Sequence, residues 1–172
     1  MPRFTSFCMT FRPARLRRAG RFLSLALLVA GCAAVPPARD AGIVVREIAA
    51  DYADVRDALD DAIRDEGLVA PTSSRFGEML ARTAADLGHR ADVYEEAEIF
   101  SFCSARISAR LVAEDVRHIA LCPLTIALYT LPQRAGLVYL AYRPPALASP
   151  AGTLARALLD DVAERTAART RR

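Results

Sequence analysis

Lysine is absent from this chain, and all 23 of its basic residues are arginine. Without a lysine amine the chain can form no Schiff base with a carbonyl substrate and cannot make the lysine contact of a phosphate-binding P-loop. Glycine-rich phosphate loops are also missing, and no serine after residue 31 stands in a nucleophile-elbow sequence. These absences exclude several well-marked enzyme classes. No enzymatic activity is indicated, and no cofactor is predicted.

No uncharged run reaches the roughly 20 apolar residues that a membrane-spanning helix needs. The run at residues 22–38 has the apolar centre FLSLALLVA and contains Pro36-Pro37. Residues 1–21, which precede it, carry six arginines and no acidic residue. A basic segment, a short apolar segment and small residues at a cleavage site are typical of a secretory signal peptide. We therefore predict a signal peptide at residues 1–31.

The end of this run, Val29-Ala30-Gly31-Cys32, resembles the lipobox of bacterial lipoproteins. In those proteins the cysteine receives a diacylglycerol and becomes the first residue after cleavage. Two or three acyl chains such as palmitate, at roughly 0.8 kcal/mol per buried CH₂, anchor a domain firmly to a membrane. The resemblance implies a lipidated Cys32 and a periplasmic domain. Ala33 stands where an aspartate would retain such a protein in the inner membrane, so the outer membrane is favoured. The alternative is an ordinary signal peptide in which Cys32 is incidental.

The positive charge of the whole chain belongs to the predicted signal peptide. Removing its six arginines leaves 17 arginines against 20 acidic residues, a net charge of −3 for the remaining 141 residues. A slightly acidic chain has no electrostatic footprint for nucleic acid, so no nucleic-acid partner is predicted. The length suits one domain and is too short for two. We expect a lipidated tether at residues 32–41 and a single domain at residues 42–172.

Hydrophobic periodicity predicts about five strands and four helices in this domain. Strands are expected at residues 42–49, 97–103, 124–131 and 137–142, with at most a short strand at 68–70. Helices are expected from Asp51 to Gly67, from N-capping residues at 72–74 to Gly88, after Ser104, and at about 153–170. Residues 92–96 are interpreted as a polar connector and 115–120 as a loop. The last two strands form a hairpin and no βαβ alternation occurs. The predicted fold class is therefore α+β, with an antiparallel sheet of about five strands and helices on one face.

Three segments of the domain resemble the bacterial and archaeal family called domain of unknown function 302. They are residues 76–88, 97–129 and 138–145, within a resemblance that covers about residues 43–145. The most specific elements are Phe102-Cys103-Ser104, Cys122-Pro123 and the strand at 126–129. The family implies a compact α+β sandwich of the broad class shared with the TATA-binding protein, without DNA binding. It implies no activity. Val116 departs from the proline expected after Asp115, which affects the shape of that loop only.

Cys103 and Cys122 lie at the end of one predicted strand and the start of the next. If these strands are neighbours, the two thiols can meet in a disulfide, which an oxidising periplasm permits. Closing this loop would contribute roughly 3 kcal/mol. The alternatives are two separate buried thiols that act as small hydrophobic side chains, or a reversible redox pair, although the C-x-x-C spacing is absent. In another form His118 joins both sulfurs to bind a soft metal such as Cu(I) or zinc. A surface loop position is the alternative for His118.

A small pocket between sheet and helices is a further candidate site, lined by Glu98, Tyr129 and Tyr139. The alternative is that these tyrosines are half-buried packing residues. A hydrolase would need His89 or His118 in a deep cleft beside a carboxylate.

No catalytic constellation emerges from these residues. The leading hypothesis is a membrane-anchored periplasmic lipoprotein whose domain binds a small ligand or a periplasmic protein. The alternative hypothesis is thiol redox or soft-metal handling by Cys103 and Cys122.

Overall fold

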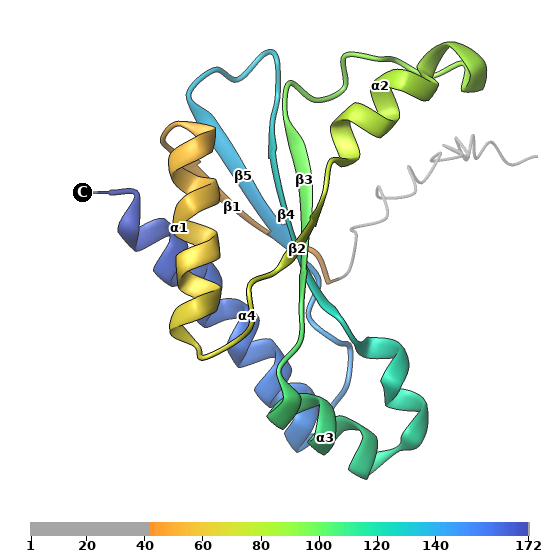
Figure 1. Cartoon of the computed structure of the whole chain (residues 1–172), viewed down its shortest axis with the longest axis vertical. Helices are drawn as coiled ribbons and strands as arrows, with labels where there is room; N and C mark the ends of the chain where they lie inside the picture. The colour runs from red at the N-terminus through yellow and green to blue at the C-terminus, as the bar shows by residue number, and fades with distance from the viewer. Residues whose placement is uncertain (1–41, 172) are drawn as a thin grey trace, which may run out of the picture. The chain divides into compact units, whose positions relative to one another are not determined.

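A computed structural model of the chain describes residues 42–171. The predicted signal peptide, Cys32 and the tether lie outside the described residues. One five-stranded sheet organises the described part, with the order β1-β5-β4-β3-β2 and every neighbouring pair antiparallel (Figure 1). Its strands are β1 (Val44–Ala49), β2 (Thr72–Ser74), β3 (Ala97–Phe102), β4 (Leu124–Thr130) and β5 (Leu137–Tyr142). The helices are α1 (Tyr52–Asp65), α2 (Phe76–Leu87), α3 (Ala105–Glu114), the 3₁₀ helix η1 (Val116–Leu121) and α4 (Pro150–Arg169).

The alternation of side chains along the strands gives the sheet two different faces. Phe100, Ile126 and Tyr142 lie in register across β3, β4 and β5, and all three are buried beneath the helices. Helices α1 and α4 pack on each other over this face, and α3 packs on α4 (Figure 1). The predicted α+β class, with an antiparallel sheet of five strands and helices packed against it, is therefore confirmed.

Two ion pairs join the C-terminal turns of α1 and α4. Arg165 Nη2 lies 3.0 Å from Glu66 Oε1, and Arg169 pairs with Asp65. The core also contains an aliphatic stripe of α1 with a four-residue spacing, in which Val55, Leu59 and Ile63 are fully buried. The arginine-rich end of α4 thus serves a packing role in addition to its favourable place at a helix C-terminus.

The polar segment Thr72–Ser74 forms strand β2 instead of capping a helix, so its predicted role is wrong. Ser73 pairs with Phe100 and Ser74 with Ile99, which satisfies the open edge of β3. The helix α2 begins after Arg75, and Arg75 makes no side-chain cap. The short strand expected at residues 68–70 does not form. Residues 72–74 form a strand because they pair with β3, since the segment has no apolar alternation of its own.

Helix α2 has an amphipathic sequence but does not bury its apolar stripe. Within α2 only Ala84 is buried, whereas Leu87 is 71% and Met79 37% exposed. The helix stands apart from α1 and α4 in Figure 1 and contacts the sheet beside β3. Gly88 ends it in the left-handed conformation, as predicted.

The remaining differences lie at helix ends. Ser104 caps α3 as predicted, with its hydroxyl accepting from the Ile107 N–H at 3.4 Å, but the Asp51 side chain makes no cap on α1. The predicted loop after Asp115 is the 3₁₀ helix η1. Helix α4 starts at Pro150, earlier than predicted, because Ser149 caps it through the Gly152 N–H at 3.1 Å. No helix within residues 42–171 is long and apolar enough to cross a bilayer.

Candidate functional site

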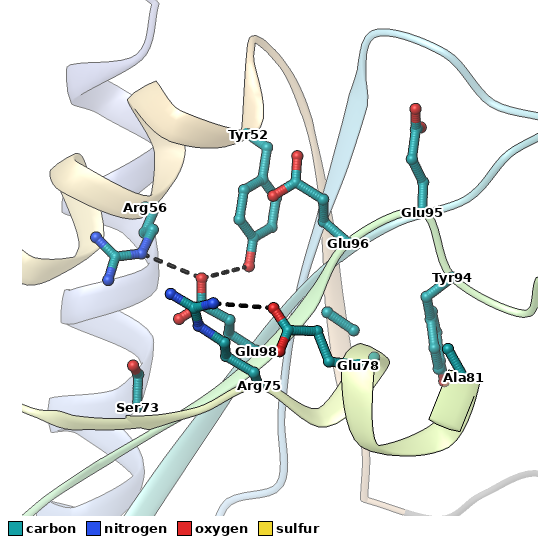
Figure 2. Close-up of a pocket in the computed structure, with 12 residues that line it drawn as sticks. Tyr52, Arg56, Ser73, Arg75, Glu78, Ala81, Tyr94, Glu95, Glu96 and Glu98 are labelled. Carbon is teal, nitrogen blue, oxygen red and sulfur yellow. Dashed lines mark hydrogen bonds and ion pairs between the residues drawn. The ribbon is translucent and has the colours of Figure 1, made fainter. Parts of the chain in front are cut away.

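A polar cleft of about 490 Å³ opens between the first turns of α1 and α2 and the start of β3 (Figure 2). Helix α1 contributes Tyr52 and Arg56, β2 and α2 contribute the opposite wall, and β3 with its preceding connector forms the floor. The lining residues are Tyr52, Arg56, Ser73, Arg75, Gly77, Glu78, Ala81, Tyr94, Glu95, Glu96, Ala97 and Glu98. Three distant parts of the sequence therefore meet at this cleft.

Glu98 is the most enclosed charged group of the cleft, with a side chain only 15% exposed. Its Oε1 accepts from the Tyr52 hydroxyl at 3.3 Å and from Arg56 Nε at 3.1 Å (Figure 2). Because Tyr52 and Arg56 are four residues apart, they share one side of α1 and reach the same carboxylate. Burial, and next the neighbouring Glu98 carboxylate, raise the pKa of Tyr52 well above its usual value. Tyr52 is therefore a protonated hydrogen-bond donor at neutral pH.

Helix α2 approaches β3 closely at Gly77. A Cβ at Gly77 would lie 3.1 Å from the Ala97 backbone nitrogen, which is tighter than ordinary van der Waals contact. At the rim, Arg75 Nη1 donates to Glu78 Oε1 at 2.9 Å, and both side chains are mostly exposed. The absence of a side chain at Gly77 thus lets the first turn of α2 form one wall of the cleft.

The charges of the cleft do not balance. Arg56 pairs with Glu98, and Arg75 pairs with Glu78. Glu95 and Glu96 are exposed, and within residues 42–171 their carboxylates have no ion pair or hydrogen bond. Their backbone N–H groups are fixed by Thr130, through its carbonyl at 3.2 Å and its hydroxyl at 3.0 Å respectively. Four glutamates and two arginines line the cleft, so its formal charge is −2.

A row of aromatic rings leads from α2 away from the cleft and across the sheet. The ring of Tyr94 lies 6.4 Å from Phe76 and 5.4 Å from Tyr129, both edge to face, and Tyr129 stacks on Tyr139 at 5.0 Å. Tyr129 is paired with Ala97, and Glu98 is paired with Leu128. The two tyrosines therefore lie on the opposite face from Glu98. The candidate pocket of Glu98, Tyr129 and Tyr139 does not form, because strand alternation separates them. The alternative, that these tyrosines are packing residues, agrees with their stacked rings and the burial of Tyr139.

We compared the chain with known protein families. The family described as "Domain of unknown function DUF302" matches residues 44–172. This chain belongs to the DUF302 family. The match extends beyond the predicted resemblance to include α4.

The DUF302 chain is also similar to a solved structure, the crystal structure of an uncharacterized conserved DUF302 protein from Bacillus stearothermophilus. The TM-score is 0.51 with 17% sequence identity, over 76% of this chain and 97% of that chain. At this identity the likeness concerns the fold alone. No curated protein matches the chain.

Cys103 and Cys122 of the DUF302 domain are both free cysteines, so the structure does not contain the disulfide considered above. The two residues follow and precede the paired residues Phe102 and Leu124. Cys103 is exposed, whereas Cys122 is half-buried with its Sγ 3.3 Å from Ser108 Oγ of α3. The thiols thus have different surroundings, one in solvent and one against a helix.

The histidines lie outside the cleft. His118 is in η1, and its Nδ1 lies 3.0 Å from the Leu111 carbonyl oxygen. His89 follows α2, with Nδ1 3.0 Å from the Arg90 carbonyl oxygen. Within the described residues, no group of three or more His, Cys, Asp or Glu side chains is placed to hold a metal ion, so His118, Cys103 and Cys122 are not assembled. Neither histidine lines the cleft, so the structure does not place the arrangement that a hydrolase would need.

The sequence alone does not indicate most of the cleft. It predicts a polar connector at residues 92–96, where the structure places Tyr94, Glu95 and Glu96 in the lining of the cleft. A signal was present, since two adjacent acids and a tyrosine directly precede a buried strand. What the sequence does not contain is the position of Tyr52 and Arg56 opposite them, which depends on packing of α1 on the sheet.

Proposed function

We propose that this protein is an exported lipoprotein whose DUF302 domain binds a small cationic ligand in the cleft between α1, α2 and β3. The export and anchoring rest on the arginine-rich start, the short apolar run and the Val29-Ala30-Gly31-Cys32 segment. Cleavage before Cys32 would leave ten residues before the described domain begins at Gly42. The domain would therefore act close to the membrane surface, with the outer membrane favoured over the inner one.

The unbalanced charge of the cleft carries the ligand proposal. Both arginines of the lining are already paired with glutamates, and among residues 42–171 the carboxylates of Glu95 and Glu96 at the opening have no ion pair or hydrogen bond. Two carboxylates beside tyrosine rings suit a protonated amine, because carboxylates attract the charge and an aromatic face stabilises a cation by about 0.5–2 kcal/mol. Tyr52 and Tyr94 are the rings available in the lining. A ligand of a few heavy atoms would fit the observed volume.

Calorimetric titration of the full chain with small amines tests the binding. Ethanolamine, putrescine and tetramethylammonium are the probes, with ethylene glycol and acetate as neutral and anionic comparisons. Glu96→Gln should weaken amine binding about tenfold, the effect of losing roughly 1–2 kcal/mol of attraction in a partly exposed site. Glu164→Gln, an exposed glutamate on α4, is the matched control and should leave binding unchanged. Absence of binding by every probe, or equal binding by both variants, would contradict the proposal.

Anchoring is tested separately by cell fractionation. The wild-type chain should sediment with membranes, and Cys32→Ser should prevent acylation and release the protein from the membrane fraction. A wild-type protein found free of membranes would contradict the lipid anchor and leave the cleft proposal standing.

A further inference from the structure

The face of the sheet opposite α1 and α4 is unusually poor in charge. Strands β3, β4 and β5 place no charged side chain on this face within the described residues. A single apolar row crosses four strands in register, from Val45 through Ala141 and Ala127 to Ile99. Val45 is 49% exposed, and the other three are partly exposed. Antiparallel sheets that face water normally alternate apolar with polar positions, and this sheet does not follow that pattern on its inner strands.

The shape of this face is defined by small residues at its centre. Ala127 and Ala141 are paired neighbours, and larger side chains flank them at Val45, Ile99 and the stacked Tyr129 and Tyr139. Tyr139 is already buried, so the accessible part of the face lies around the alanines and Val45. A flat centre of this kind allows a second sheet to approach to about 10 Å, the usual spacing of packed sheets. An exposed apolar face of this type marks a surface that associates with another protein.

The charge pattern favours an identical face as the partner. The only charged side chain on this face of β1 is Glu47, at the edge, where Arg134 lies 3.7 Å away. Two copies packed through the uncharged centre would bury no unpaired charge and would bring no like charges together. Four strands spaced by ~4.8 Å and about six residues long present roughly 400 Å² of flat area, so two faces together would bury roughly 800 Å², which is below the range of stable interfaces. The area therefore suits a reversible dimer instead of an obligate one.

We propose that two copies of this protein associate through the sheet face opposite α1 and α4, with the row Val45–Ala141–Ala127–Ile99 at the centre of a two-fold interface. Such an interface is self-complementary, since the same row meets itself across the symmetry axis. The row lies on the opposite face of the sheet from Glu98, which forms the floor of the cleft.

Sedimentation velocity of the full chain tests the association. A Cys32→Ser background removes the site of acylation, and reductant prevents exposed Cys103 from cross-linking. The background protein should shift from monomer to dimer over roughly 1–200 μM, the range of a weak interface. Ala127→Glu should remain monomeric throughout, because it places a charge at the centre of each face. Ala157→Glu, an exposed alanine on α4, is the matched control and should dimerise like the background protein.

Circular dichroism reports whether Ala127→Glu is folded. If it is not, Val45→Asp at the half-exposed end of the row replaces it, with the same expected loss of dimer. A background protein that stays monomeric at 200 μM would overturn the proposal. A dimer that survives in the folded charge variant would also overturn it, since the contact would then lie elsewhere.

Discussion

Arg56 and Glu98 are joined by a 3.1 Å contact between Nε and Oε1, although 42 residues separate them. The contact fixes the first turns of α1 to the start of β3, and the Tyr52 hydroxyl donates to the same oxygen. The Glu98 side chain is only 15% exposed, so water cannot easily replace its carboxylate as the acceptor for Tyr52 and Arg56. Loss of this carboxylate should therefore cost more stability than loss of an exposed ion pair. The cleft therefore has a fixed floor beneath an open and acidic rim.

Replacing the Glu98 carboxylate tests how much it contributes to the free energy of unfolding. Glu98→Ala leaves Tyr52 and Arg56 without their acceptor and should lower the free energy of unfolding by about 1–3 kcal/mol. Urea denaturation of the full chain measures the loss. Glu78→Ala breaks the exposed pair with Arg75 and should cost at most about 0.5 kcal/mol. Equal losses in the two variants would contradict the role given to Glu98.

The stability of the domain should fall at alkaline pH. Burial, followed by neighbouring carboxylates, raises the pKa of Tyr52, and burial also raises the pKa values of Tyr129 and Tyr142. In the unfolded chain these phenols ionise near pH 10, whereas the folded chain retains their protons. Their contribution to stability is therefore complete below pH 10 and is lost as the pH rises above it.

Urea denaturation between pH 8 and about 11.5 measures this dependence. The free energy of unfolding should be flat near pH 8 and decline above pH 10, and Tyr52→Phe should make the decline shallower. Absorbance of tyrosinate should show Tyr52 ionising above an ordinary tyrosine. A decline of the same slope in Tyr52→Phe would show that Tyr52 holds no raised pKa.

The two thiols of the domain should react at different rates. Cys103 is exposed, whereas Cys122 is half-buried beside Ser108. In a chain carrying Cys8→Ser and Cys32→Ser, a thiol reagent should modify one cysteine rapidly and the second only slowly until urea is added. Cys103→Ser should abolish the rapid phase. Two cysteines that become reactive only after reduction would show a disulfide and revive the redox hypothesis.

The strands and the buried helix stripes could be predicted from the sequence because they depend on local periodicity. Phe100 and Phe102 stand two residues apart and therefore share one face of a strand, and Val55, Leu59 and Ile63 recur every four residues, so both patterns indicate a buried face. Strand β2 could not be predicted in this way. Thr72–Ser74 carries no apolar side chain, and only its pairing with β3, far along the chain, makes it a strand.

The site was predictable in part. The alternation that places Phe100 and Phe102 together also places Glu98 on their face, and the alternation of Ile126 and Leu128 in β4 places Tyr129 on the other face. Strand alternation therefore separates Glu98 from Tyr129. The stripe of α2 shows a different limit. Its spacing is that of a buried helix, but an amphipathic pattern does not specify whether a partner element is present, and Leu87 remains exposed.

The most direct test of the account is the intact mass of the protein isolated from the membranes of the cells that produce it. We predict a chain that begins at Cys32 and carries the added mass of two or three acyl chains, with residues 1–31 removed. A protein that retains its N-terminal arginines, or that begins near residue 32 with no acyl mass on its cysteine, would contradict the lipid anchor.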